Sequence, residues 1–116
     1  MRMKDKVVLV TGGAAGIGRA TALRFAEEGA TVVICDLNEV AGQATAAELG
    51  PGAAFYKVNV TSQAEVKTWV ADVIARYGRI DVLVNNAGIV RDGQLVKFKE
   101  GEFVGQMAEA DSDLVV

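Results

Sequence analysis

Four short, almost continuously apolar segments alternate along the chain with longer segments that have helical periodicity. The apolar segments are KVVLVT, TVVIC, AAFYKV and DVLV, at residues 6–11, 31–35, 53–58 and 81–84. They are rich in β-branched residues and show no polar alternation, which is typical of strands covered on both faces in a parallel sheet. The pattern therefore predicts four parallel strands.

Two helices are predicted in the first two intervals. The first runs from about residue 16 to residue 28, and its apolar positions form one stripe: Gly18, Ala22, Phe25 and Gly29. The second is alanine-rich, runs from about residue 38 to residue 49, and is ended by the sequence GPG. Its weak apolar stripe consists of Val40, Ala44 and Ala47.

A third helix is predicted after Ser62. Ser62 and Glu65 have the spacing of a capping box, in which each side chain accepts a hydrogen bond from the other residue's amide. The apolar face that follows consists of Val66, Trp69, Val70, Val73 and Tyr77. Gly78 is the predicted C-terminal stop of this helix.

Strands and helices alternate with connections short enough to force parallel strands and right-handed crossovers. The predicted fold class is therefore α/β: a Rossmann-like three-layer domain with about four parallel strands, equivalent to a truncated half of a doubly wound sheet. We expect a core at residues 1–88 and, in the same domain, a tail at residues 89–116. The tail sequence predicts a hairpin and the first turn of another helix.

Composition narrows the functions open to the chain of 116 residues, which is 51% hydrophobic and 23% charged, with a formal net charge of −3. No segment collects basic residues, which argues against a nucleic-acid partner. No apolar run is long enough for a signal peptide or a membrane span, so we expect a cytoplasmic protein.

The chain has no histidine, which excludes Ser-His, Cys-His and most zinc chemistry. The single cysteine, Cys35, ends an apolar run and is expected to be buried.

A glycine-rich turn, TGGAAGIG at residues 11–18, follows the first strand and opens the first helix. Such a turn binds phosphate because the backbone approaches without a Cβ and the helix N-terminus offers free amides. The candidate binding residues are Gly12, Gly16, Ile17 and Gly18. The alternative is that the glycines only pack the helix against the strand. Their place after the first strand of an α/β pattern favours a dinucleotide site.

Asp36 ends the second strand, 18 residues after Gly18. A carboxylate at this place can accept hydrogen bonds from both hydroxyls of an adenosine ribose, and its charge repels a 2′-phosphate. No Arg or Lys lies between Gly12 and Gly18, so the pattern favours NAD over NADP. The alternative is that Asp36 caps the second helix.

These motifs, taken in order, resemble the short-chain dehydrogenase/reductase family. The residues that carry the resemblance are TGGAAGIG, Asp36, NV at residues 59–60 and NNAG at residues 85–88. The loop NNAGIVRDG is most similar to the branch that contains 3-oxoacyl-acyl-carrier-protein reductases. The resemblance implies a Rossmann-like fold and hydride transfer between NAD(H) and a ketone or alcohol.

The resemblance also implies a role for each matched position. Gly12, Gly16, Ile17 and Gly18 would hold the pyrophosphate and the nicotinamide side, and Asp36 with Leu37 would hold the adenosine ribose. The remaining positions implied to border the cofactor are Asn59 and Val60 at the adenine, and Asn86, Ala87 and Gly88 at a ribose below the fourth strand. Many members have Asp at the place of Asn59, so the polarity of this contact differs. Asn85 is expected to tie neighbouring strands together.

The catalytic residues of the family have no counterpart in this sequence. The family's chemistry resembles acid catalysis by a tyrosine with a lysine four residues later, assisted by a serine and an asparagine. Only Tyr56 and Tyr77 are present, and the residues four places later are Val60 and Asp81. We therefore expect the chain to be inactive alone.

Three functions remain open. In the first, the chain is an NAD-binding part of an oxidoreductase and is inactive alone. In the second, it is an NAD-binding module for sensing or assembly. In the third, it is a folded remnant that binds nothing and is held together by self-association. The fourth strand is expected to form an apolar sheet edge, which soluble proteins seldom leave bare. Residues 89–116 or a second copy of the chain are expected to cover it.

Overall fold

The sheet has four parallel strands in the order β3-β2-β1-β4, which confirms the predicted half of a doubly wound sheet. The computed structural model describes residues 3–86. In chain order the elements are β1 (Val7–Thr11), α1 (Gly16–Glu27), β2 (Thr31–Asp36), α2 (Glu39–Glu48), β3 (Ala54–Lys57), α3 (Gln63–Tyr77) and β4 (Val82–Asn85). The hairpin and helical turn predicted for residues 89–116 lie outside the described residues.

The strand order reverses at β1. The chain builds outward from β1 through β2 to β3, and then returns to place β4 on the other side of β1. Thr11 at the end of β1 is in register with Cys35 of β2 and with Asn85 of β4. In doubly wound sheets, ligands bind beyond the carboxyl ends of the strands at such a reversal.

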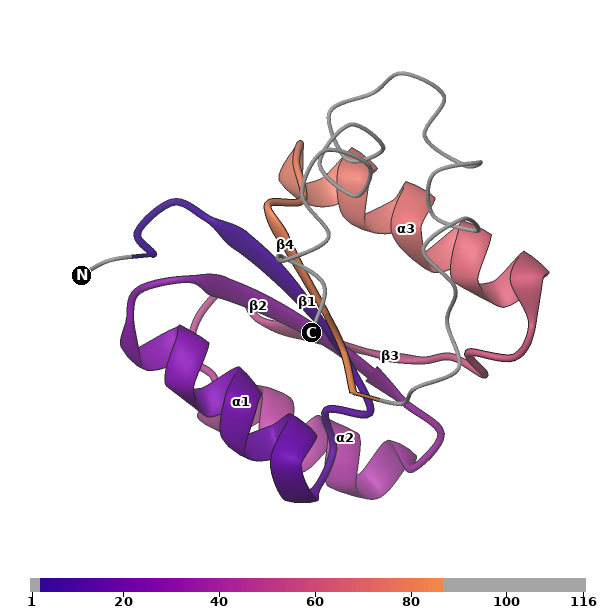
Figure 1. Cartoon of the computed structure of the whole chain (residues 1–116), viewed down its shortest axis with the longest axis horizontal. Coiled ribbons are helices and arrows are strands. Elements are labelled where there is room, and N and C mark those ends of the chain that lie inside the picture. Colours follow the sequence, from indigo (N-terminus) through magenta and orange to yellow (C-terminus); the bar gives the residue numbers. More distant parts are fainter. Residues whose placement is uncertain (1–2, 87–116) are drawn as a thin grey trace.

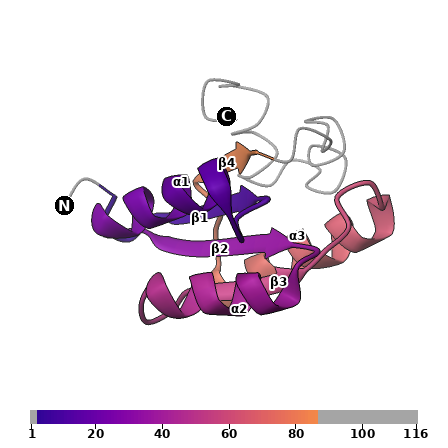
Figure 2. The same ribbon diagram turned by 90° about the horizontal axis from the view of Figure 1, so that it is seen from below.

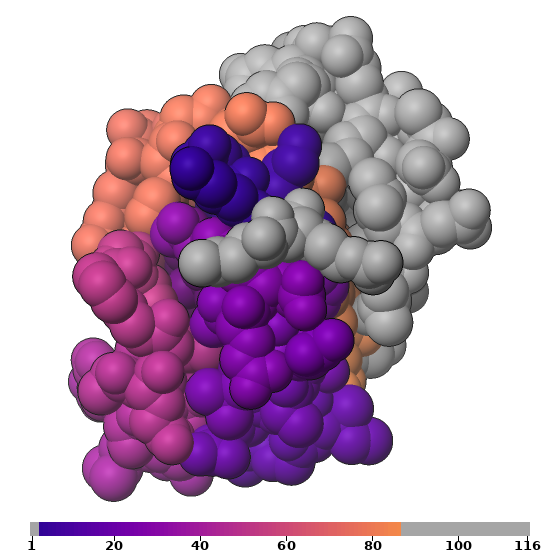
Figure 3. Space-filling model, turned by 90° about the vertical axis from the view of Figure 1, so that its left-hand side faces the viewer, coloured from indigo at the N-terminus to yellow at the C-terminus, as the bar shows by residue number. Residues whose placement is uncertain are grey.

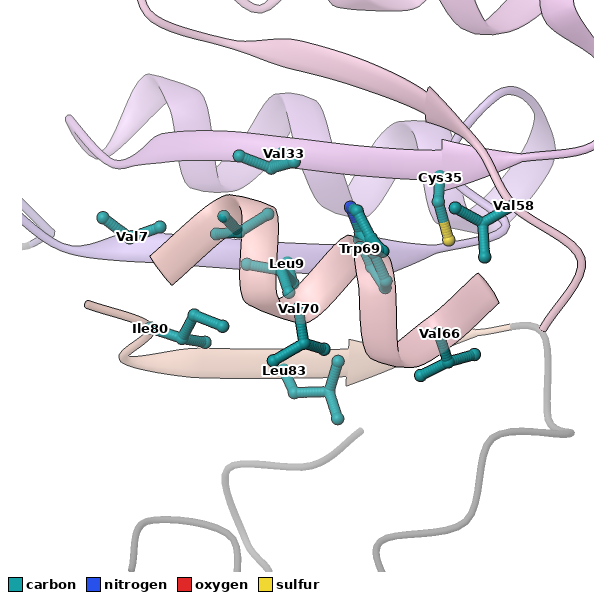
Figure 4. Close-up of a cluster of buried hydrophobic side chains, with 11 residues drawn as sticks. Val7, Leu9, Val33, Cys35, Val58, Val66, Trp69, Val70, Ile80 and Leu83 are labelled. Carbon is teal, nitrogen blue, oxygen red and sulfur yellow. The ribbon is translucent and has the colours of Figure 1, made fainter. Parts of the chain in front are cut away.

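Helices cover both faces of the sheet and make the three layers that the sequence predicts (Figures 1 and 2). Helix α3 packs on one face. Its side chain Trp69, which is 1% exposed, lies between the helix and the sheet (Figure 4). The core on this side consists of Val7, Leu9, Val33, Cys35, Val58, Val66, Trp69, Val70, Val73, Ile80 and Leu83. The predicted apolar face of α3 is confirmed, with Tyr77 half-buried at its end.

Helices α1 and α2 pack on the opposite face. The core there consists of Val8, Val10, Ala22, Ala30, Val32, Ile34, Leu49, Val82 and Val84. The side chains of Val8, Val10, Val32 and Ile34 alternate along β1 and β2 with those that face α3. Figure 3 shows the start of the described chain, in indigo, beside the surface of α1, in purple, and the amide of Met3 donates to the carbonyl of Glu28 at 2.8 Å.

The predicted apolar stripe of α2 is wrong. Val40 is 83% exposed, and Ala44 and Ala47 are also exposed, whereas Gly42 and Thr45 are the buried residues of this helix. Gly42 faces the ring of Phe55 in β3, and a Cβ at this position would lie 2.1 Å from the ring carbon Cε1. Alanine is too small to define a face by periodicity, so this close contact with β3 decides which side of α2 is buried.

The start of α3 confirms one half of the predicted capping box. The Ser62 Oγ accepts a hydrogen bond from the Glu65 amide at 3.2 Å, and Gly78 ends the helix with a φ of +83°. The other half is wrong, because the Glu65 carboxylate accepts from the amide of Asn59 at 2.9 Å rather than from Ser62. The Ser62 amide instead donates to the Asn59 carbonyl, also at 2.9 Å. These bonds join α3 to the loop that follows β3.

We predict that Gly42→Ala destabilises the protein, although alanine is the better helix former by about 1 kcal/mol at exposed positions. The added methyl group overlaps the Phe55 ring, and overpacking of this kind costs about 1–3 kcal/mol. Urea unfolding measures the change. The double variant Gly42→Ala/Phe55→Leu should recover most of the loss, and a stabilised single variant would contradict the packing argument.

Candidate functional site

The glycines of the segment 12–18 have two different physical roles. Gly13 and Gly18 are required by packing, since a Cβ on Gly13 would lie 2.6 Å from Ile34 Cγ2 and one on Gly18 would lie 1.9 Å from the Gly12 carbonyl oxygen. Gly12 and Gly16 instead have positive φ angles of 64° and 59°. A Cβ on Gly16 would meet no atom within 4 Å, so the space beside this residue is open. Packing therefore explains only part of the motif.

The N-terminus of α1 leaves its first backbone donors available. The N-cap residue Ala15 makes no side-chain capping bond, and no group among residues 3–86 accepts from the amides of Gly16, Ile17 and Gly18. The side chain of Ile17 is 77% exposed beside them. Free amides at a helix N-terminus, next to an open space, form an arrangement that attracts an anion.

Asp36 connects the glycine-rich segment with the start of α2. Its Oδ2 accepts from the amide of Ala14 at 3.1 Å, and its Oδ1 accepts from the amide of Asn38 at 3.1 Å. The N-cap of α2 is Asn38, whose Oδ1 accepts from the Ala41 amide at 3.0 Å, so the capping role considered for Asp36 belongs to its neighbour. Each Asp36 carboxylate oxygen can accept a second hydrogen bond.

A cleft of about 220 Å³ lies beside Asp36. Its lining consists of Gly12, Asp36, Leu37, Val58, Asn59, Val60 and Thr61. Five of the residues that the sequence singles out are thus brought together: Gly12, Asp36, Leu37, Asn59 and Val60. The volume is below the 300–1,000 Å³ of typical complete ligand pockets, so it fits part of a larger ligand. Leu37 is 59% exposed and offers an apolar wall.

Two larger hollows lie elsewhere. One, of about 450 Å³, lies between β3 and α3, and the other, of about 480 Å³, lies between Met3 and α1. Neither is lined by a residue that the sequence singles out for binding. The cleft at Asp36 is smaller than both, but it is lined by five of the residues that the sequence singles out.

Asn59 is held in a fixed orientation at the cleft. Its side-chain Oδ1 accepts from the backbone amide of Thr61 at 3.0 Å and from the Thr61 hydroxyl at 2.6 Å. The backbone amide of Asn59 donates to the Glu65 carboxylate. Because the Thr61 amide requires an acceptor, these bonds assign the oxygen and the nitrogen of the Asn59 amide. Among residues 3–86 the NH2 group makes no hydrogen bond within this turn. Because Asn59 lines the cleft, its side chain can offer a donor there, where a carboxylate would offer only acceptors.

The end of β4 contacts the glycine-rich segment directly. The Asn86 Nδ2 donates to the Gly12 carbonyl at 3.2 Å. The Thr11 hydroxyl donates to Asn85 Oδ1 at 3.2 Å, which confirms that Asn85 ties β4 to β1. Ala87 and Gly88, which the sequence also singles out, lie outside the described residues.

Sequence reasoning missed Thr45. This residue of α2 is 1% exposed, and its hydroxyl donates to the carbonyl of Ala14 at 3.1 Å. A threonine in an alanine-rich helix has no sequence signal for such a contact, because the partner is 31 residues away.

Neither Tyr56 nor Tyr77 has the lowered pKa expected of a catalytic acid. The Tyr56 hydroxyl donates to Asp72 at 2.5 Å, and the Tyr77 hydroxyl donates to the Gly52 carbonyl at 2.7 Å. Burial raises the pKa of Tyr56, with a further contribution from Asp72, and burial also raises the pKa of Tyr77. A catalytic tyrosine of the kind described above requires a pKa shift in the opposite direction.

The remaining reactive groups do not form a site in the described part of the chain. Cys35 is fully buried, as expected, and burial raises the pKa of its thiol to about 12. No group of three Cys, Asp or Glu side chains among residues 3–86 is arranged to hold a metal ion. In the same range, none of the helices combines the length and the apolar character needed to cross a bilayer.

A family model described as short chain dehydrogenase matches residues 6–110. The chain belongs to this family. It is 49% identical over 106 residues to the 3-oxoacyl-acyl-carrier-protein reductase FabG of Thermotoga maritima, a match that covers 89% of this chain and 43% of the relative. It is also 49% identical over 89 residues to a sorbitol dehydrogenase of Cereibacter sphaeroides, covering 77% of this chain and 35% of the relative.

Solved structures agree with this assignment. An NAD+-bound xylitol dehydrogenase superposes with a TM-score of 0.73 and 33% identity, over 93% of this chain and 48% of the other. A short chain dehydrogenase/reductase from Burkholderia phymatum in complex with NAD gives a TM-score of 0.68 and 26% identity, over 72% of this chain and 31% of the other. The chain therefore spans less than half the length of each of these four relatives.

Proposed function

We propose that this chain is the NAD-binding N-terminal part of a short chain dehydrogenase, a class of enzyme that transfers hydride between NAD(H) and a ketone or alcohol. The observation that carries the proposal is the open space beside Gly16, next to three amides without an acceptor in the described residues. These features fit a pyrophosphate group. The NAD bound in the two structural relatives supports the same assignment.

The proposed contacts divide the dinucleotide between two regions. Gly12, Gly16, Ile17 and Gly18 hold the pyrophosphate and the nicotinamide side, and Asp36 with Leu37 holds the adenosine ribose. The further proposed contacts are Asn59 and Val60 at the adenine and Asn86, Ala87 and Gly88 below β4. The common cleft of Gly12, Asp36, Leu37, Asn59 and Val60 supports the adenosine half of this assignment.

We further propose that the chain alone does not transfer hydride. The sequence has no Tyr followed four residues later by Lys, and the raised pKa values of Tyr56 and Tyr77 argue against either as the acid. Part of the ligand contacts would also be missing, so we expect weak affinity for NAD. In this view the chain contributes binding, and the similarity to a 3-oxoacyl reductase indicates its origin rather than a substrate.

A binding module without catalysis, which associates with itself, is the second candidate. Within the described residues β4 pairs with β1 on one side and has no partner strand on the other, and an open strand edge of this kind pairs readily with another chain. A cytoplasmic location is consistent with both candidates and remains a proposal.

Two glycines with the same backbone requirement provide a test of the proposed pyrophosphate site. Gly16→Ala and Gly78→Ala both place a Cβ at a positive φ, 59° and 83°, with no atom within 4 Å, so each should cost about 1–2 kcal/mol of stability. Only Gly16→Ala fills the proposed pyrophosphate space. We expect isothermal titration with NAD and ADP-ribose to show binding by the wild type and Gly78→Ala, and none by Gly16→Ala. Equal affinities in both variants would contradict a ligand beside Gly16.

A further prediction concerns the choice between NAD and NADP. Asp36→Asn keeps an oxygen for one of the two amides that Asp36 binds but removes the negative charge. Hydrogen bonds to a charged group are worth about 1.5–3 kcal/mol, so NAD affinity should fall about 10- to 100-fold while the repulsion of NADP disappears. Titration with both dinucleotides measures the ratio, and an unchanged preference would exclude Asp36 as the ribose ligand.

The proposed self-association can also be tested. If the free edge of β4 pairs between chains, sedimentation velocity at increasing concentration should show a dimer. The variant is Leu83→Pro, which removes a backbone donor from β4. Leu83 is itself 4% exposed and belongs to the core on the α3 face, so the loss of its side chain needs a control. Its control is Leu83→Ala, which loses core volume but keeps the amide. A monomer for the wild type at all concentrations would contradict this candidate.

A further inference from the structure

Ala14 is held on both sides by residues from distant parts of the chain. It lies in the glycine-rich segment and is 4% exposed. Its amide donates to the Asp36 carboxylate at the end of β2, and its carbonyl accepts from the Thr45 hydroxyl in α2, each at 3.1 Å. The backbone at Ala14 is therefore oriented by two side chains rather than by a helix or a strand.

The Thr45 hydroxyl does not make the bond that is common for this residue type. Threonine within a helix often donates to the carbonyl one turn earlier in its own helix. Here the hydroxyl leaves the helix and satisfies the Ala14 carbonyl, which would otherwise be a buried acceptor without a partner among residues 3–86. The close contact of Gly42 with Phe55 sets the distance of α2 from the sheet, so the hydroxyl is within reach of the segment.

The N-terminus of α2 also orients the Asp36 carboxylate. The Asn38 amide, at the N-cap of α2, binds Asp36 Oδ1, while Asp36 Oδ2 binds the Ala14 amide. Ala14 directly precedes Ala15, the N-cap of α1, after which the three free amides begin. One helix thus holds both the carboxylate and the backbone that leads into those amides.

We propose that Thr45 is a positioning residue for dinucleotide binding, because its hydroxyl fixes the glycine-rich segment relative to Asp36. This inference rests on the proposed function. A ligand that carries both a ribose and a diphosphate must reach Asp36 and the amides of Gly16–Gly18 at the same time. Their relative placement then determines affinity, and Thr45 touches neither group of the ligand.

The test compares Thr45→Val, which keeps the volume and removes the hydroxyl, with Thr45→Ser, which keeps the hydroxyl. ADP-ribose is titrated into the isotope-labelled chain and followed by NMR. We expect Thr45→Val to weaken binding about fivefold, equivalent to one neutral hydrogen bond, and Thr45→Ser to stay within about twofold. Val73→Ala, in the core on the α3 face, controls for lost stability and should bind like the wild type.

A second readout follows the Ala14 amide itself. Its hydrogen exchange should become at least tenfold faster in Thr45→Val, relative to the amides of β1, and should stay slow in Thr45→Ser and Val73→Ala. A purely structural role for Thr45 would change the melting temperature without changing the affinity beyond that of Val73→Ala. Wild-type affinity in Thr45→Val, with or without faster exchange, overturns the proposal.

Failure of the proposed function is distinguishable from failure of this inference. If the wild-type chain does not bind ADP-ribose, the dinucleotide proposal fails. The role of Thr45 in binding fails with it, and the exchange rate of Ala14 then tests only the structural premise. A rate increased only in Thr45→Val supports the premise that the hydroxyl holds the glycine-rich segment, and an unchanged rate contradicts it.

Discussion

The candidate site depends on the close approach between the start of α1 and the carbonyl of Gly12. A Cβ on Gly18 would lie 1.9 Å from this carbonyl oxygen and 2.7 Å from the Asn86 Nδ2 that donates to it, so only glycine permits the contact. The approach puts the N-terminus of α1 at the end of β1, where the strand order reverses. The open space beside Gly16 and the free amides follow from this placement.

Asp36 combines a structural role with its proposed role in binding. Its two oxygens hold the amides of Ala14 and Asn38, and this orders the carboxylate before any ligand arrives. A carboxylate that is already oriented loses little side-chain freedom when it accepts a hydroxyl, which favours affinity. The same bonds mean that a change at Asp36 alters the glycine-rich segment as well as the ligand contact.

Within the described residues, β3 and β4 form the two edges of the sheet. The relatives are more than twice as long as the part that this chain matches, and β4 pairs within the described residues only with β1. The ends of β1 and β2 and the loop after β3 line the cleft at Asp36. No tyrosine in this sequence is followed four residues later by a lysine, the pair that the resemblance to the family implies for the chemical step.

The sequence alone determined the four strands, the three helices and five of the seven residues that line the cleft. Continuous apolar runs and glycine positions are local signals, and they place Gly12, Asp36, Leu37, Asn59 and Val60 correctly at strand ends, which meet at one edge of a parallel sheet. Only the tertiary structure decided the buried face of α2, the partner of Glu65 and the contact of Thr45 with Ala14. The reason is physical: small or polar side chains carry little periodic signal, and which contact they make depends on what another segment brings within reach.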